Sequence, residues 1–339
     1  MRILPSTDAL EFASAVGELL ARSCDVPALR AAWDGDTGRV PGLWKRLAEI
    51  GVTGLTVPAE HGGAGMDLTA AVPVLVELGR AAAPEPLAAT LAGVALLAAA
   101  GGPVAEEWLP RVAAGDAALA VGEGTPAQLS GGSWADLVLV ACDEPHGIWA
   151  VRRDDAAVAP IDALDRGAGL ASVAWSGGVE VGGADGWLAF DTACVAVAAE
   201  LVGQAQAMLD MSVRYAAQRE QFGKPIGSFQ AVKHQLADVY VAIAFAAPVV
   251  HRAAWSVAHR LPSQARDASH AKLAATAAAE RAARTALQVH AGIGYTYEHE
   301  LHMWMKRTWT LASQWGDPSF HRRRVTAAVL ADTPSPRVP

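Results

Sequence analysis

The stretch YAAQREQFGKPIGSFQA (residues 215–231) marks a break between two long helical patterns. Before it, apolar and small residues recur at intervals of four, three, four and three, which is one face of a helix: Leu201, Ala205, Met208, Ser212 and Tyr215. We expect this helix to end near residues 223–225, where glycine and proline break it. After the break, Ser228 is the expected N-cap of a second helix. The buried face of that helix is expected to carry Val232, Leu236, Val239 and Ile243.

Three more helices are predicted beyond this pair. One runs from about Asp267 to His290 and stops where Gly292 and Gly294 follow. The next covers residues 300–311, and the last begins near Pro318. Residues 188–332 therefore predict a bundle of about four helices, with chain neighbours antiparallel.

The segments before the bundle differ in pattern. Residues 1–118 predict a helical domain, in which one helix runs from Leu68 past Gly79 with Pro73 placed early. Residues 119–187 carry short apolar runs at 137–140 and 148–151 between glycine and aspartate turns, which predicts a small, shortened β domain. The tail at 333–339 is rich in proline, and we expect it to be disordered.

Composition excludes several classes of function. The 339 residues carry a formal net charge of −8, which argues against nucleic acid as a partner because phosphate binding needs clustered cations. The three cysteines lie far apart and form no CxxC pair, so we expect reduced thiols, a cytoplasmic location and no metal site. Residues 87–105 carry no charge and are long enough for a membrane span, but Gly101, Gly102 and Pro103 interrupt the segment. We therefore expect a buried helix rather than a membrane span.

Three stretches, in order along the chain, resemble the acyl-CoA dehydrogenase family. They are VPAEHGGAG (57–65), the stretch at 215–231 with LAD (236–238), and ALQVHAGIGYT (286–296). The resemblance implies a mainly α fold: a helical domain, a β domain and a four-helix bundle. It also implies FAD bound at the interface between two subunits.

The resemblance further implies which residues contact the diphosphate and adenine half of a neighbour's FAD. They are Arg219, Phe222, Gln230, Gln288 and Gly292. An arginine offers a rigid fork to phosphate oxygens, and a glycine lets backbone approach a ligand. A purely structural role remains open for these residues. An arginine can interact with the C-terminal end of a helix dipole, and a glutamine near glycines can belong to a capped helix end.

The family's catalytic carboxylate is missing from both positions where it occurs. It removes the α-proton of the acyl thioester, so its pKa must be raised by burial. At one position this chain has Trp315, and an indole accepts no proton usefully. At the other it has Ala193, followed by Cys194 in place of the family's arginine. Two carboxylates near these motifs, Asp317 and Glu298, are substitutes of low probability, and Glu200 is expected to be structural.

The β domain departs from the family as well. A flavin-contacting stretch of the TEPxxGSD kind is expected near residue 122, but the chain has VGEGTP (121–126) and no GSD after it. We therefore expect a hetero-oligomer, of the type α2β2, in which a homologous catalytic subunit supplies the base and the acyl-CoA site. The substrate that the resemblance suggests is a bulky steroid side-chain CoA thioester. The rivals are a competent homo-oligomer with a displaced carboxylate and a helical scaffold or regulatory protein without flavin.

Two other signals have ordinary explanations. His299, Glu300 and His302 are spaced as HExH, which matches no known zinc pattern, so they are expected in the bundle or at an interface. The arginines at 322–324 are expected on a solvated helix face rather than on a CoA phosphate.

Overall fold

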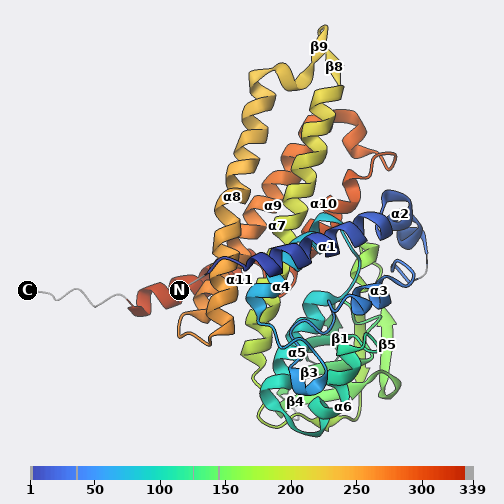
Figure 1. Cartoon of the computed structure of the whole chain (residues 1–339), viewed down its shortest axis with the longest axis vertical. Helices are drawn as coiled ribbons and strands as arrows, with labels where there is room; N and C mark the ends of the chain where they lie inside the picture. The colour runs from blue at the N-terminus through green and yellow to red at the C-terminus, as the bar shows by residue number, and fades with distance from the viewer. Residues whose placement is uncertain (1–2, 36, 125, 144–145, 333–339) are drawn as a thin grey trace, which may run out of the picture.

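The computed structural model describes residues 3–35, 37–124, 126–143 and 146–332. Helices come first, strands second and helices again last, so the fold is mainly α, as expected (Figure 1). The long helices of the last part stand as an upright bundle, and the strands are gathered beneath it. The tail at 333–339, for which disorder was predicted, lies outside the described residues.

The first part of the chain is helical, and side chains cap several of its helices. Ser6, Asp25 and Asp67 each accept a backbone N–H of the first turn that follows, which starts α1, α2 and α4. Helix α4 begins at Leu68, as expected, but Pro73 lies inside the helix, past its first turn, so the expectation that its missing N–H costs little there is wrong. The elements are α1 (Thr7–Ser23), α2 (Val26–Asp34), α3 (Leu43–Glu49), the 3-10 helix η1 (Ala59–His61), α4 (Leu68–Arg80), α5 (Leu87–Ala100) and α6 (Gly102–Ala113).

Two small sheets follow. The first has the strand order β1-β3-β4-β7, with β1 and β3 parallel, and the second has the order β2-β6-β5. The strands are β1 (Leu119–Glu123), β2 (Ala127–Leu129), β3 (Leu137–Asp143), β4 (His146–Arg152), β5 (Ala156–Pro160), β6 (Ala171–Trp175) and β7 (Val179–Glu180), with 3-10 helices η2 (Arg153–Asp155) and η3 (Arg166–Ala168).

Strand β3 shows how the layers form. Its side chains alternate: Leu137 and Leu139 pack with α5 and α6, whereas Val138 and Val140 pack with the second sheet. A strand presents successive side chains to opposite faces, so an uninterrupted apolar run fits a strand that is buried on both sides. The β part is therefore a helix layer and two sheets stacked on one another.

The last part of the chain is the bundle. Its central helix is α7, which packs against α4, α5, α8 and α9, while α11 packs on α9. The elements are α7 (Gly186–Gln218), β8 (Glu220–Gln221), β9 (Lys224–Pro225), the 3-10 helix η4 (Ile226–Ser228), α8 (Gln230–Ala258), α9 (Gln264–His290), the 3-10 helix η5 (Ala291–Tyr295), α10 (Leu301–Ser313) and α11 (Pro318–Asp332).

Two helices of the bundle, α7 and α8, are long and apolar enough to cross a membrane by length and composition alone. The most apolar window of α7 is 83% buried within the fold, as in the core helix of a globular protein. The uncharged segment that begins at Leu87, for which a buried helix was expected, forms α5. Its 14 residues are largely buried against α7 and the first sheet.

The break between α7 and α8 is a β-hairpin rather than a simple helix end. Helix α7 ends at Gln218, earlier than expected, and Gln221 pairs with Lys224 across a two-residue turn. Ser228 ends the 3-10 helix η4, and α8 begins after Phe229 without a side-chain cap, so the expected role of Ser228 as N-cap is wrong.

Two glycines let α4 and α7 approach closely. A Cβ on Gly79 would lie 2.1 Å from the carbonyl oxygen of Glu200, and a Cβ on Gly203 would lie 2.0 Å from that of Val76. Both distances are far below contact, so only glycine fits at this crossing. The crossing places Glu200 between the N-terminal helices and the bundle.

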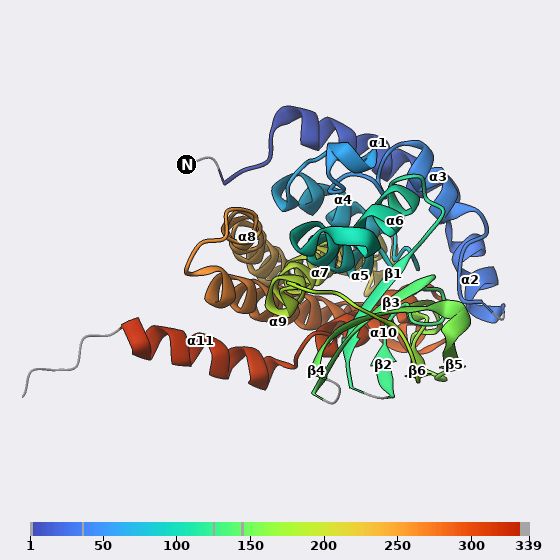
Figure 2. The same ribbon diagram turned by 90° about the horizontal axis from the view of Figure 1, so that it is seen from below.

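Helix α11 leaves the body of the molecule toward the C-terminus (Figure 2). Arg322 and Arg323 are exposed on it, as expected. Arg324 departs from that expectation: it is half-buried and forms an ion pair with Asp191 of α7. This pair ties the start of α11 to the first turns of α7.

Candidate functional site

The residues expected to contact FAD lie at one end of the bundle. The hairpin β8–β9 forms the tip of that end (Figure 1). Near it, the ring of Tyr215 on α7 stacks on His290, the last residue of α9, with ring centroids 4.5 Å apart. His299 meets the edge of the same histidine ring at 4.6 Å. This stack joins the motif at 215–231 to the motif at 286–296, although they lie far apart in the sequence.

Phe222 lies at the tip of the hairpin. Its φ is +54°, and the φ of Gly223 is +77°, the left-handed pair required by a two-residue turn of type I′. A bulky residue there is unusual, and a left-handed backbone costs about 1–3 kcal/mol unless its surroundings impose it. The ring is 91% exposed and meets only the edge of Phe229.

Gln288 and Gly292 flank a second strained turn. Between them, directly after the last residue of α9, Ala291 has φ +52° and ψ −134°, a region otherwise populated almost only by glycine. Glycine would adopt this conformation without steric cost, so the methyl group of Ala291 adds backbone strain as well as bulk. A Cβ on Gly292 would meet nothing within 4 Å, so the backbone faces open space there.

Three polar side chains at this end have no partner. Within the described residues, Arg219, Gln230 and Gln288 are exposed and make no side-chain hydrogen bond or ion pair. A free guanidinium suits a diphosphate, which offers acceptors, and two free carboxamides suit an adenine, which offers both an amino donor and ring-nitrogen acceptors. Together with the open backbone at Gly292, these groups fit the adenine-diphosphate half of FAD approaching from outside the chain.

The second candidate region is a cleft between the β part and the bundle. It encloses about 660 Å³, within the range of small-molecule sites. Aromatic side chains form one wall of this cleft: Trp187, Phe190, Trp315 and Phe320. Ala193, at the other family position for the base, is buried on α7 and does not line the cleft. The described lining therefore offers an indole, and no carboxylate, at the family's base positions.

The loop that carries Trp315 is held from several sides. The carbonyl oxygen of Trp315 accepts from His321 Nε2 at 2.9 Å, and Cys194 Sγ lies 3.6 Å from it. Lys272 Nζ donates to Ala312 O at 2.9 Å. Burial lowers the pKa of His321 to about 4, so its ring is neutral at pH 7. These contacts impose the left-handed backbone of Trp315, whose φ is +56°.

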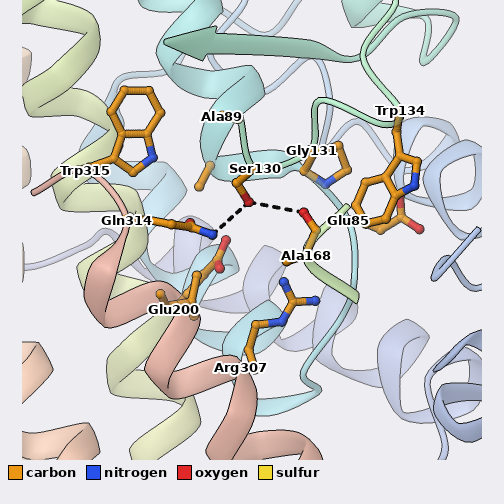
Figure 3. A pocket seen from close by; sticks show the side chains of 13 residues that line it. Glu85, Ala89, Ser130, Gly131, Trp134, Ala168, Glu200, Arg307, Gln314 and Trp315 are labelled. Atoms are coloured by element: carbon orange, nitrogen blue, oxygen red, sulfur yellow. Dashed lines mark hydrogen bonds between the residues drawn. The ribbon is translucent and has the colours of Figure 1, made fainter. Parts of the chain in front are cut away.

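A small cavity of about 30 Å³ lies behind this loop (Figure 3). Gln314 Nε2 donates to Ser130 Oγ at 2.8 Å, and Ser130 Oγ donates to Ala168 O at 3.2 Å, across the top of the cavity. Glu200 and Arg307 line its lower side. The space holds a water molecule or two, which is too little for a substrate.

Charges around this cavity nearly balance. Arg39 pairs with Glu85, and Arg307 pairs with Asp165. Glu200, 9% exposed, is a third carboxyl without a cation of its own. Burial raises its pKa to about 7, and the charge of Arg307 opposes that rise. Burial also raises the pKa of Glu85 and Asp165. Glu200 is therefore a buried structural residue at the cavity where the N-terminal helices, the β part and the bundle meet.

The two substitute carboxylates lie away from the cleft lining. Asp317 is exposed and caps α11, where its carboxylate accepts the Phe320 N–H at 2.7 Å. Glu298 is exposed in the loop between η5 and α10. No group of three or more potential ligands for a metal ion occurs among the residues that the structure describes.

Sequence reasoning missed two groups of residues. The cluster around Arg307 has a weak signal, because Arg307 falls on the apolar face of α10 with Trp304 and Leu311. Arg30 has no signal: its guanidinium donates to the carbonyl oxygens of Tyr297 and Glu298, at 2.8 and 2.7 Å, and nothing local predicts that pairing.

Comparison with known proteins gives the family. Residues 6–116 match the model for the acyl-CoA dehydrogenase N-terminal domain, and residues 188–330 match the model for the C-terminal domain. The chain is 40% identical over 318 residues to acyl-CoA dehydrogenase IpdE2 of Mycobacterium tuberculosis, covering 93% of this chain and 95% of the relative. It is 37% identical to the IpdE2 of Mycolicibacterium smegmatis over 317 residues, covering 93% and 96%.

Solved structures share the fold. The crystal structure of the ChsE4-ChsE5 complex from Mycobacterium tuberculosis matches with a TM-score of 0.87 and 26% identity, covering 99% of this chain and 100% of that one. A glutaryl-CoA dehydrogenase from Mycobacterium smegmatis in complex with FADH2 matches with a TM-score of 0.83 and 19% identity, covering 98% and 96%. The two domain models and the near full-length relatives agree: the chain belongs to the acyl-CoA dehydrogenase family.

Proposed function

We propose that this chain is a subunit of an FAD-dependent acyl-CoA dehydrogenase that helps to bind a partner's flavin and supplies no catalytic base. Arg219, Phe222, Gln230, Gln288 and Gly292 contact the adenine-diphosphate half of an FAD held mainly by a homologous subunit. That partner contributes the base and the acyl-CoA site. The reaction is the α,β-dehydrogenation of an acyl-CoA thioester, and the thioester of a bulky steroid side chain is the proposed substrate.

One observation carries the proposal: the free polar groups and the strained tip lie at the same end of the bundle. Folding alone gives no reason for Phe222 to hold a left-handed backbone with its ring in solvent. Such outliers concentrate where a ligand or partner is bound. Arg219 lies just before the tip, and its side chain has no partner among the described residues.

The cleft supports the second half of the proposal. A base must accept a proton at the α-carbon of the thioester, and Trp315 has only an N–H donor. Hydrogen bonds from His321 and Lys272 hold its loop, and the one carboxylate in the described lining of the cleft, Glu123, occupies neither of the family's base positions. Glu200 faces the small cavity behind the loop, which has no room for an acyl chain.

A partner subunit is supported by the surface of α8. Tyr240, Val241 and Phe245 are exposed along this helix, and an apolar face of this kind is typical of a contact surface. The ChsE4-ChsE5 structure, which resembles this chain, is a complex of two different proteins. We propose the same kind of assembly here, with two copies of each subunit.

The test is the flavin content of the assembly. This chain is tagged and co-expressed with a homologous acyl-CoA dehydrogenase subunit that carries the catalytic glutamate, and FAD is measured by absorbance after purification. Arg219→Ala is expected to weaken FAD binding about tenfold or more, because it removes charge-assisted hydrogen bonds. Arg219→Lys should fall between, since an ammonium cannot form the bidentate contact. Arg214→Ala, at an exposed position in the last turns of α7 before Arg219, is the matched control.

Two results would count against the proposal. If the chain purified alone is yellow and oxidises an acyl-CoA, it is a competent enzyme with a displaced base. If the assembly keeps its full flavin after Arg219→Ala, the chain serves as a scaffold without flavin contacts.

A further inference from the structure

A clamp joins α2 to the loop that follows the flavin motif of α9. Arg30 is half-buried on α2, and its two terminal nitrogens donate to the carbonyl oxygens of Tyr297 and Glu298, at 2.8 and 2.7 Å. A guanidinium offers its N–H groups in a rigid fork, so two bonds to consecutive carbonyls fix the direction of the backbone as well as its position. This is the only arginine among the described residues that binds two consecutive backbone carbonyls so far away in the sequence.

Aromatic contacts strengthen the same junction. Trp33, one turn after Arg30 on α2, meets His302 edge-on at 5.6 Å. The Lys306 ammonium lies 5.2 Å from the ring of Trp33 and 4.6 Å from the ring of Tyr297. The start of α10 and the loop before it are therefore packed on α2 as one unit.

The clamped segment begins at the strained turn. Ala291 holds φ +52° and ψ −134°, a conformation that an L-residue leaves when nothing holds it. On the upstream side, the stack of Tyr215 on His290 fixes the end of α9. On the downstream side, the carbonyls bound by Arg30 fix the exit of the loop. The turn is thus held between two anchors, and Gly292 lies inside it.

We infer that Arg30 is a positioning residue for flavin binding: it holds the segment from Ala291 to Glu298 in the flavin-binding conformation, against the backbone strain at Ala291. The inference rests on the proposed function, because it assumes that Gln288 and Gly292 meet FAD. Arg30 itself does not touch the cofactor. Its effect is to keep the open backbone at Gly292 facing outward.

The test measures FAD affinity, not turnover. The assembly purified through this chain is stripped of flavin, and FAD is titrated back with flavin fluorescence as the signal. Arg30→Ala is expected to raise the dissociation constant about tenfold, because two charge-assisted bonds to the loop are lost. Arg30→Lys should raise it about threefold, since an ammonium can keep one of them. Arg22→Ala is the control: that arginine is exposed on α1 and approaches only Glu18.

The strain supplies a second, independent readout. Ala291→Gly removes the steric cost of the turn, so the clamp is needed less. In the Ala291→Gly background, Arg30→Ala should therefore raise the dissociation constant by no more than about threefold. Amide hydrogen exchange should show residues 291–300 opening faster in Arg30→Ala, and less so when Ala291→Gly is added.

The outcomes separate this inference from the proposed function. If Arg219→Ala weakens FAD binding and Arg30→Ala leaves it within about twofold, the inference is overturned and the proposed function stands. If the effect of Arg30→Ala is equally large in both backgrounds, the strain at Ala291 is not what the clamp opposes, and the inference is overturned as well. If neither arginine affects FAD binding, both proposals fall.

Discussion

Glu200→Gln should make the protein more stable at alkaline pH. Glu200 belongs to a buried cluster in which Arg39 pairs with Glu85 and Arg307 pairs with Asp165, and it is the carboxyl group for which no ion pair is described. Because its burial raises the pKa of Glu200 to about 7, the folded chain keeps this proton at a pH where the unfolded chain has lost it. Glutamine has nearly the same shape and stays neutral at every pH, so it reproduces the protonated form.

The size of the effect follows from proton linkage. The ordinary pKa of the group is 4.5, so between pH 4.5 and about 7 the folded state binds more protons than the unfolded state. The free energy of unfolding therefore falls as the pH rises through this window. The stability that protonated Glu200 contributes is fully present below pH 4.5 and lost once the pH passes about 7. Each pKa unit of difference is worth about 1.4 kcal/mol, which gives a total of about 3 kcal/mol.

The assay compares thermal melting of the wild type and Glu200→Gln from pH 5 to pH 8.5. The two should melt within about 1 °C of each other at pH 5, and the variant should melt about 4 °C higher at pH 8.5, given the unfolding entropy of a chain of this length. Glu49→Gln, at an exposed position on α3, is the control and should follow the wild type throughout. A difference in melting temperature between wild type and Glu200→Gln that stays the same from pH 5 to pH 8.5 would refute the reasoning. Glu200 would then have the same pKa in the folded and the unfolded state.

Two further predictions concern packing and acid stability. Gly79→Ala should lower the free energy of unfolding by about 3 kcal/mol in urea, because its Cβ would meet the Glu200 carbonyl at 2.1 Å, whereas Gly177→Ala, with open space around it, should have little effect. The lowered pKa of His321, about 4, means that the unfolded chain binds more protons from pH 6.5 down to about 4, so stability falls as the pH drops through that window. His321→Gln should cost about 1 kcal/mol at pH 7 but make that fall shallower, and an unchanged slope of urea midpoint against pH would contradict it.

Much of the fold could be predicted because its signals are long and local. The periodic positions of α7 and α8, and the apolar run at residues 137–140, each extend over much of one element and so predict it from the local sequence alone. The ends were harder. The hairpin after Gln218 requires a left-handed backbone at Phe222. Nothing in the local sequence predicts that conformation for a phenylalanine.

The site divides in the same way. The residues around Arg219 and Gly292 were assigned by resemblance, and the structure places them at one end of the bundle without testing their contacts. The partners of Arg30 are 267 and 268 residues away, so only the tertiary fold brings them together. Arg307 is intermediate: a charge on an apolar helix face predicts a buried partner but not which one.

The cleft and the hairpin end of the bundle differ in what surrounds a residue with a left-handed backbone. At the cleft, the left-handed Trp315 is surrounded by groups that bond its own carbonyl and its neighbours, so the fold itself accounts for the strain. At the end of the bundle, the left-handed Phe222 has its ring in solvent, and the nearby Arg219 side chain has no partner in the described part of the chain. Contacts within the fold hold the backbone of Trp315, whereas none of the described contacts does the same for Phe222. The missing partners of that end are therefore to be sought outside this chain, which is why the flavin content of the assembly is the measurement on which the proposed function depends.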